Sequence, residues 1–297
     1  MPKTTLGPSA IPPGGVPTGS VSGTGLCCAC PASGTVSKNG NGNYFRSGYA
    51  MSSNITNKCS IAFVRTATGG TVTISKTFSL SYVAGATARA HQSSITNAIT
   101  TAMSNWTSGA SSHKLQIQQP GCRTQKLRIV FTSTIASSGA NVSVRVDNTT
   151  PTAATGNLRS FVRGGTQMTF YVQGIGTTGW TMTHEIGHTF GLPDEYISLP
   201  GVPITPPPTT AGAAMVTPPV ATPTMTYIGS PPQANSAVVL TSNFIDPSNP
   251  MNYYFDNAGI MGQNGNTTYP ANNFYWIAIE VKRIMAAAGT PANVSIV

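Results

Sequence analysis

One run in the second half of this 297-residue chain constrains the fold more than any other: HEIGHTFGLPD, from His184 to Asp194. Histidines four residues apart lie on the same face of an α-helix, so the run predicts a helix with His184 and His188 on one side. Gly191 stands where a residue of left-handed conformation ends such a helix, and Pro193 prevents the helix from resuming. We therefore expect a helix that ends sharply, followed by a chain that turns back toward the histidines.

The residue types in this run are those of a hydrolytic zinc site. Such a site has three protein ligands and one position open for water. His184 and His188 supply two ligands, and we expect Asp194 to be the third. Glu185 adjoins the first ligand, where its carboxylate can take a proton from zinc-activated water and return it to the leaving amine. The run therefore predicts one Zn²⁺ ion together with a general base and acid.

Three other acidic residues compete with Asp194 for the third ligand position. Glu195 is the nearest, and Asp246 and Asp256 lie further along the chain. Adjacent carboxylates point in different directions, so we expect only one of Asp194 and Glu195 to bind the metal. The other would act beside the site or in an ion pair. The turn that follows Gly191 favours Asp194.

The pattern H-E-x-x-H-x-x-G-x-x-D resembles the metzincin clan of zinc metalloproteases, in the variant with Asp as third ligand, as in snapalysin-like enzymes. The resemblance covers residues from about 60 to 290. It implies a Met-containing turn beneath the metal, and the segment 259–262 with Met261 is similar to that turn, while Met251 is a weaker candidate. Many metzincins have a Tyr two residues after this Met, where the present chain has Gln263.

The tyrosines and histidines near this site but outside the motif are expected to have structural roles. Tyr253, Tyr254 and Tyr269 are close to the Met turn in sequence and are expected to pack rather than to assist catalysis. His91 and His113 each stand alone, and we expect them at the surface or at helix ends.

Periodicity along the rest of the chain predicts an α+β fold. Residues 71–83 alternate apolar and polar side chains like a half-buried strand, and residues 86–106 have apolar side chains at three- and four-residue steps like an amphipathic helix. Short strands are expected at 115–119, 126–133, 141–147, 158–163 and 167–173, and a closing helix at 272–288. The resemblance implies a metzincin-like catalytic domain: a twisted, mostly parallel sheet, with 86–106 as backing helix, the active-site helix and 272–288 as C-terminal helix.

Composition changes along the chain suggest its division into domains. Residues 1–57 are rich in Gly, Pro and Ser and predict an N-terminal arm or a small irregular subdomain. Residues 58–297 are expected to form the catalytic domain. A Pro-rich insertion at about 198–235 interrupts it, and we expect an extended loop there.

Charge and cysteine content bear on location and partners. Only 8% of residues are charged, and the net charge of +9 comes from 16 scattered basic and 7 acidic residues, which does not favour nucleic-acid binding. No stretch has the length of a membrane span, and no signal peptide is visible. The composition is typical of exported microbial proteins, so we expect a protein secreted or delivered outside its cell by a dedicated secretion machine.

The five cysteines are an odd number, so at least one thiol lacks an intrachain partner. Cys59 and Cys122 are far enough apart in sequence to bridge two elements. For Cys27, Cys28 and Cys30, a disulfide or a local structural site is favoured over a thiolate that blocks the zinc.

The sequence predicts a zinc-dependent endopeptidase that acts on polypeptide substrates. The alternative is a catalytically silent zinc-binding or interaction module of metzincin fold. Glu185 favours the enzyme, because a purely structural zinc site needs no general base and usually has a fourth Cys or His ligand.

Overall fold

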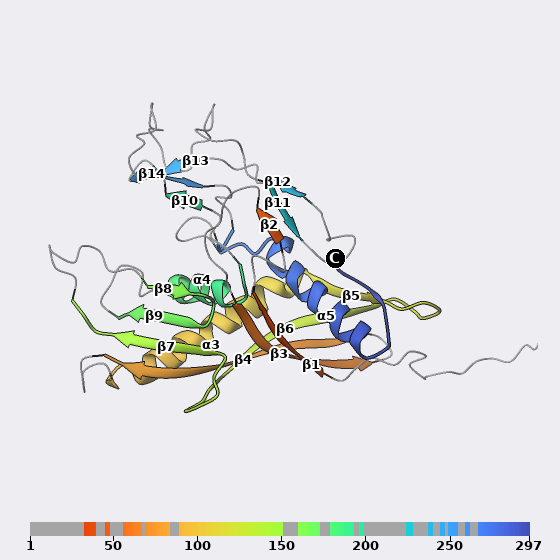
Figure 1. Cartoon of the computed structure of the whole chain (residues 1–297), viewed down its shortest axis with the longest axis horizontal. Helices are drawn as coiled ribbons and strands as arrows, with labels where there is room; N and C mark the ends of the chain where they lie inside the picture. The colour runs from red at the N-terminus through yellow and green to blue at the C-terminus, as the bar shows by residue number, and fades with distance from the viewer. Residues whose placement is uncertain are drawn as a thin grey trace, which may run out of the picture.

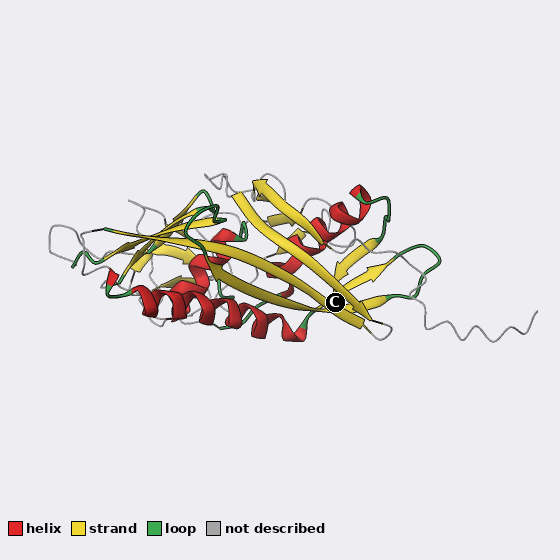
Figure 2. Cartoon of the chain, turned by 90° about the horizontal axis from the view of Figure 1, so that it is seen from below, coloured by secondary structure: helices red, strands yellow, loops and turns green. Residues whose placement is uncertain are grey.

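A twisted sheet of nine strands is the main element of the computed structural model (Figures 1 and 2). The structure describes residues 33–39, 45–47, 56–66, 69–83, 89–150, 160–172, 179–192, 196–198, 224–227, 237–239, 244–246, 249–254, 259–261 and 267–297. The strands of the large sheet are β1 (Ser33–Asn39), β3 (Thr56–Thr66), β4 (Gly69–Tyr82), β5 (Lys114–Gln118), β6 (Gln125–Ile135), β7 (Val142–Asp147), β8 (Phe161–Arg163), β9 (Gln167–Tyr171) and β15 (Asn293–Ile296).

The sheet is mixed, with its parallel part in the centre. The strand order is β15-β5-β6-β4-β7-β9-β8, and β3 and β1 continue from the first half of β4. The pairs β4·β6, β4·β7 and β7·β9 are parallel, and the flanking pairs are antiparallel. The expected mixture of helices and a twisted sheet is confirmed, and the expected parallel pairing occurs in the central pairs.

The helices form where the sequence has three- and four-residue apolar spacing. They are α3 (Gln92–Gly109), α4 (Gly179–Thr189) and α5 (Tyr275–Ala287), with 3-10 turns η1 (Ala110–Ser112) and η2 (Ala271–Phe274). In α3 the buried residues are Ile95, Ile99, Ala102, Met103 and Trp106, which form one face of the helix. This face packs against β6 and α4, so α3 joins the histidine motif to the sheet.

The core lies on one face of the sheet. Along β4, Val72, Ile74 and Phe78 are buried and alternate with partly exposed Ser and Thr residues. One residue departs from the apolar pattern on the buried face: Lys76 is also fully buried. The opposite face of β4 is polar, which is typical of a sheet covered on one side only.

Two small sheets of three strands complete the described structure (Figure 1). One consists of β10 (Tyr196–Ser198), β14 (Asn249–Tyr254) and β13 (Phe244–Asp246), and the other of β12 (Ala237–Val239), β11 (Thr224–Tyr227) and β2 (Phe45–Ser47). The insertion expected at 198–235 contributes β11, and its proline runs lie outside the described residues. Within the Gly- and Pro-rich first 57 residues, β1 pairs with β3 in the large sheet.

Cys59 and Cys122, which the sequence leaves free to bridge two elements, are not bonded to each other. Cys59 is a free, fully buried thiol on β3, whereas Cys122, in the turn between β5 and β6, is disulfide-bonded. A bridge between Cys59 and Cys122 is therefore not formed. The side chain of Cys59 points into the core with Ile61 and Phe63, and burial raises its pKa to about 11.

Candidate metal centre

The motif helix α4 is buried along most of its length and is held by side chains of α3. His184 and Glu185 are 4% and 6% exposed. Trp106 Nε1 donates a hydrogen bond to Thr183 O at 2.9 Å, and Asn105 Nδ2 donates to Thr183 Oγ1 at 3.1 Å. The position immediately before the motif is therefore fixed by two side chains of the neighbouring helix.

Both motif histidines have their Nδ1 atom bonded to a main-chain carbonyl. His184 Nδ1 lies 2.9 Å from Ile260 O, and His188 Nδ1 lies 2.8 Å from Leu192 O. A carbonyl oxygen only accepts hydrogen bonds, so Nδ1 must be the donor in each ring, and the lone pair is then on Nε2. Such a bond sets the tautomer and orientation of an imidazole that binds a metal.

The two rings are neighbours on one face of the helix. Their centroids are 4.8 Å apart and their planes nearly perpendicular, at 88°. Trp180, one turn before His184, stacks on that ring with a centroid distance of 4.8 Å and an interplanar angle of 24°. The indole of Trp180 covers one face of the His184 ring, and Ile260 O holds the Nδ1 atom. Together these contacts restrict the rotation of the ring.

The helix ends as the sequence predicts. Gly191 has φ +85°, a left-handed conformation that favours glycine. Gly191 N donates to His188 O at 3.0 Å, and Leu192 N donates to Gly187 O at 3.3 Å, which reverses the chain direction. Because of this reversal, Leu192 O reaches back to the ring of His188.

Met261, in the segment 259–262, packs against the motif helix. Its side chain is fully buried. A Cβ atom added to Gly187 would overlap Met261 Sδ and lie 2.9 Å from Trp106 Cζ2. Ile260, the residue before Met261, supplies the carbonyl that holds His184. The turn therefore contacts the motif twice, once through a side chain and once through the main chain.

The remaining predicted site residues lie in parts of the chain without described side chains. Asp194, Glu195, Asp256, Gln263, Cys27, Cys28 and Cys30 are outside the described residues, and Asp246, Met251, Tyr253 and Tyr254 are described only as positions on β13 and β14. Within the described part of the chain, no three His, Cys, Asp or Glu side chains form a metal-binding group. The structure thus brings together His184, Glu185, His188, Gly191 and Met261.

The histidines outside the motif and Tyr269 have packing roles. His113 is partly buried, with Nε2 2.9 Å from Tyr269 O and its ring 5.2 Å from that of Phe274. Tyr269 packs edge-on against Trp106 at 5.1 Å, and burial raises its pKa to about 12. His91 precedes α3 and accepts the first helical hydrogen bond from Ile95 N. The structural roles expected for these residues agree with these contacts.

A hollow of about 380 Å³ adjoins the motif on the side of Trp180. Its lining includes Asn105, Trp180, Thr183, Ile260 and Tyr269. A second hollow, of about 510 Å³, adjoins the first and shares Gly109, Thr267 and Tyr269 with it. The first hollow is next to His184, because Trp180 stacks on that ring and Ile260 binds it.

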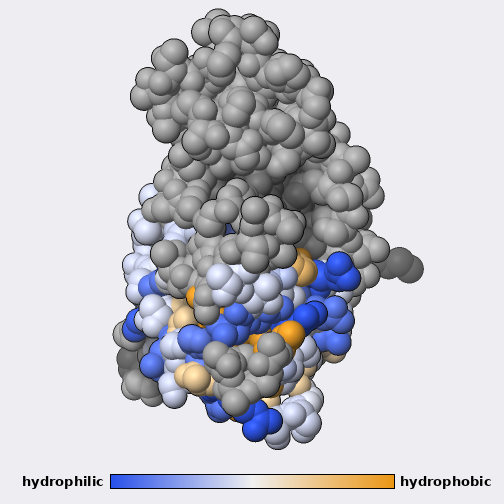
Figure 3. Space-filling model, turned by 90° about the vertical axis from the view of Figure 1, so that its left-hand side faces the viewer, coloured by the Kyte–Doolittle hydropathy of each residue, from blue (hydrophilic) through white to orange (hydrophobic). Residues whose placement is uncertain are grey.

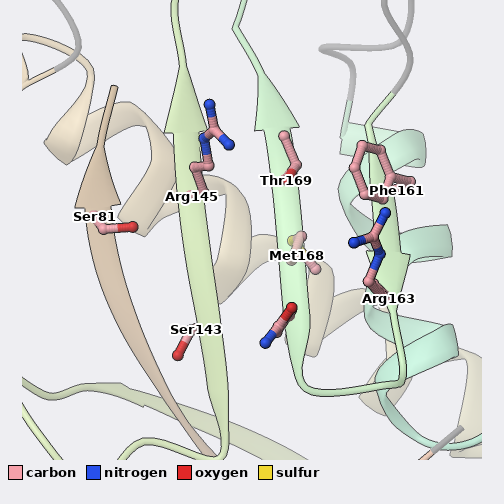
Figure 4. A pocket seen from close by; sticks show the side chains of 8 residues that line it. Ser81, Ser143, Arg145, Phe161, Arg163, Met168 and Thr169 are labelled. Atoms are coloured by element: carbon pink, nitrogen blue, oxygen red, sulfur yellow. The ribbon is translucent and has the colours of Figure 1, made fainter. Parts of the chain in front are cut away.

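A third hollow, of about 330 Å³, lies on the polar face of the sheet, away from the motif. Figure 4 shows Arg145 on β7 and Phe161 and Arg163 on β8, with β9 between these strands and helices behind them. Arg145 is paired with Asp147 at 3.5 Å. Figure 3, which faces this end of the molecule, shows mainly hydrophilic described surface with isolated hydrophobic residues. The hollow contains no motif residue and is separate from the candidate metal centre.

Several groups that orient the motif could not be identified from the sequence. The carbonyls of Ile260 and Leu192 have no sequence signal, because every residue has a carbonyl. The position of Trp180 does carry a sequence signal, since a residue four positions before His184 lies on the same helix face. Trp106 ends the amphipathic helix predicted at 86–106, but nothing in the sequence indicates its hydrogen bond to α4.

Among the described residues, no helix combines the length and hydropathy needed to cross a bilayer. A comparison of the chain with protein-family models finds no match, and a comparison with curated proteins also finds none.

Proposed function

We propose that this chain is a zinc-dependent endopeptidase of the metzincin type, with His184, His188 and Asp194 as metal ligands and Glu185 as general base and acid. The observation that best supports the proposal is the pair of Nδ1 hydrogen bonds from the histidines to Ile260 O and Leu192 O. Two adjacent imidazoles with Nδ1 protonated each offer Nε2 to a metal on the same helix face.

The donor set fits zinc. Imidazole nitrogen suits Zn²⁺, whereas Ca²⁺ and Mg²⁺ prefer sites made of oxygen ligands alone. Two imidazoles and one carboxylate are a ligand combination of catalytic zinc sites, which keep a position for water. The third ligand, Asp194, follows Leu192 by two residues, and Leu192 is the residue whose carbonyl contacts His188.

Glu185 is the residue we assign to proton transfer. Zinc would supply the Lewis acid that makes a water molecule nucleophilic near neutral pH. The Glu185 carboxylate accepts the proton of the attacking water and then donates it to the amide nitrogen as the C–N bond breaks. Its 6% exposure limits contact with bulk solvent, which keeps the proton available for the leaving amine.

The surroundings of the motif favour a polypeptide substrate. Strand β8 pairs with β9 on one side, and its other side is an edge among the described strands. An extended peptide can add to such an edge through main-chain hydrogen bonds, and β8 contacts α4. The hollow of about 380 Å³ beside His184 would then receive one substrate side chain, with Trp180 and Ile260 as its walls.

The finer description of the fold is part of the same proposal. A metzincin-like catalytic domain over residues 58–297 is supported by the parallel centre of the sheet, the backing helix α3, the motif helix α4 and the C-terminal helix α5. Delivery outside the producing cell is supported by the disulfide bond of Cys122, because disulfides persist mainly in oxidising compartments.

The proposal is tested by incubating the zinc-loaded protein with casein, gelatin and a proteome-derived peptide mixture. We expect cleavage products by mass spectrometry, and their loss in Glu185→Ala. Stoichiometric zinc binding without cleavage of any substrate would instead support the alternative, a catalytically silent zinc-binding module. Absence of zinc binding by the wild-type protein would overturn both.

A further inference from the structure

Lys76 is a lysine in the middle of the hydrophobic core. It lies on β4 between Ile74 and Phe78, on the face of the strand that packs against the helices, and it is fully buried. Moving an ammonium group from water into a protein interior costs several kcal/mol unless polar partners compensate. A lysine at such a position therefore requires an explanation from its contacts.

The ammonium group has three acceptors for its three N–H bonds. Lys76 Nζ donates to Asn57 Oδ1 at 3.1 Å, to Lys58 O at 2.7 Å and to Thr189 O at 2.8 Å. It also lies 5.0 Å from the ring centroid of Phe190, within cation–π range. Two of these four partners are the last residue of the motif helix and the residue that follows it.

Thr189 O is the last carbonyl of the helix, and Lys76 is its partner. The three carbonyls before it are satisfied by the segment that ends the helix: Ile186 O by Thr189 Oγ1 at 2.7 Å, Gly187 O by Phe190 N at 2.9 Å and His188 O by Gly191 N at 3.0 Å. The last carbonyls of a helix have no partner within the helix, and a cation there is stabilised by the helix dipole. Lys76 thus completes the hydrogen bonding of this helix end from the central strand of the sheet.

The same helix end determines the orientation of His188. The turn that follows Thr189 brings Leu192 O to 2.8 Å from His188 Nδ1. Thr189 is held by Lys76 on one side of this turn, and Leu192 binds the imidazole on the other. A shift of Thr189 relative to β4 would therefore move Leu192 O, the acceptor that orients the His188 ring.

We propose that Lys76 is a positioning residue of the metal centre: it fixes the turn 189–192 to the sheet and thereby orients His188. The effect on zinc binding rests on the proposed function. The hydrogen bond from Lys76 Nζ to Thr189 O does not depend on a metal. Among the described residues, Lys76 donates hydrogen bonds to Asn57, Lys58 and Thr189 and to neither motif histidine, so its effect on His188 is through the turn.

Stability alone does not account for a lysine here. Replacing buried ionic groups by apolar residues of similar volume is often neutral or stabilising, because the desolvation cost disappears. Burial indeed lowers the pKa of Lys76 to about 8, and the nearby titratable group Cys59 opposes that shift. A methionine would fill the same space without this cost but would leave Thr189 O without its donor.

The test uses Lys76→Met, which is close to isosteric. We expect the zinc dissociation constant to rise about 10- to 100-fold, the range typical of losing a group that orients a ligand. The absorption spectrum of the Co²⁺-substituted protein should also change, because it reports the coordination geometry. The matched control is Val72→Ala, on the same face of β4 four residues away, which loses core packing but should keep the zinc affinity within about threefold and the same spectrum.

A second readout needs no metal. In the apo protein, we expect Lys76→Met to accelerate amide hydrogen exchange of Gly191 and Leu192 and to shift the His188 ring ¹⁵N resonances, and Val72→Ala to do neither. If the wild-type protein bound no zinc, the proposed function would fail while these measurements still decided the role of Lys76. If the wild-type protein bound zinc and cleaved peptides, but a folded Lys76→Met behaved like Val72→Ala, the positioning role would be overturned and the function would stand.

A double variant covers the case in which Lys76→Met does not fold. The single change leaves Asn57 Oδ1 buried without the donor Lys76 Nζ. Asn57→Val combined with Lys76→Met removes this acceptor as well, and valine is favoured in β-strands. The same losses of zinc affinity and of exchange protection are expected. Wild-type values for both in the folded double variant would refute the inference.

Discussion

Met261 Sδ packs directly against Gly187, in the space that any larger residue at position 187 would need. The motif therefore requires glycine between its histidines for a steric reason, although helices disfavour glycine by about 1 kcal/mol. Trp106 lies on the same side of Gly187, so this side of the helix is enclosed by Met261 and by Trp106 of α3.

Gly187→Ala should destabilise the protein and disturb the metal site. The added methyl group overlaps Met261 Sδ, and such overpacking costs about 1–3 kcal/mol of unfolding free energy. Urea unfolding and zinc affinity measure the two effects. The matched control is Gly179→Ala in the same helix, where a Cβ meets nothing within 4 Å. That change should leave zinc affinity unchanged, and equal behaviour of the two variants would contradict the steric argument.

Metal binding should be one zinc per chain and should depend on both histidines. We expect His188→Ala to lose stoichiometric zinc in metal analysis after dialysis, since two remaining ligands hold the ion poorly. Asp194→Ala should have a similar effect. An unaffected Asp194→Ala variant would move the third ligand role to Glu195 or to a later acid, and an unaffected His188→Ala variant would rule out the site.

Glu185→Gln should keep zinc and fold but lose most peptide hydrolysis. The amide is nearly isosteric with the carboxylate but cannot accept and return a proton, and general acid–base groups typically contribute about 10²- to 10⁴-fold. Initial rates on a peptide found to be cleaved by the wild-type protein provide the measurement, with zinc content as control. Activity within about tenfold of wild type would show that another group transfers the proton.

Local patterns in the sequence predicted the elements that surround the site. Alternation at 71–83 predicted β4, apolar spacing predicted most of α3 and α5, and the motif predicted both α4 and the left-handed Gly191. These features depend on neighbouring residues, so a single sequence contains them.

Contacts between distant segments could not be predicted in the same way. Ile260 O and His184 are separated by 76 residues, and Thr189 O and Lys76 by 113. The alternation of β4 places Lys76 on the apolar face, but a strand lysine is usually solvent-exposed, and its acceptors come from three separate positions. That Cys59 is a free thiol likewise could not be predicted, because it depends on how the folded core buries this residue.

The pH dependence of stability offers a test of the burial of Lys76. The pKa of this lysine is lowered from 10.5 to about 8 in the folded protein, mainly because burial disfavours the charged form. Below pH 8, Lys76 is protonated in both the folded and the unfolded states, and the burial cost is present in full. Between pH 8 and 10.5, the folded state releases the proton while the unfolded state keeps it. The unfolding free energy should therefore rise with pH, by on the order of 3 kcal/mol in total.

This rise must be separated from the titration of other buried groups. Cys59 has a pKa raised to about 11, and that shift lowers stability as pH increases above 9, so the experiment uses a Cys59→Ala background. Tyr269, with its pKa raised to about 12, acts in the same direction above pH 10 and is present in every variant. Urea unfolding at several pH values from 7 to 10 then compares Cys59→Ala with Cys59→Ala/Lys76→Met. We expect the lysine protein to gain stability relative to the methionine protein above pH 8. Parallel curves would mean that Lys76 has the same pKa in the folded and unfolded states, and hence that its ammonium group is not buried as described.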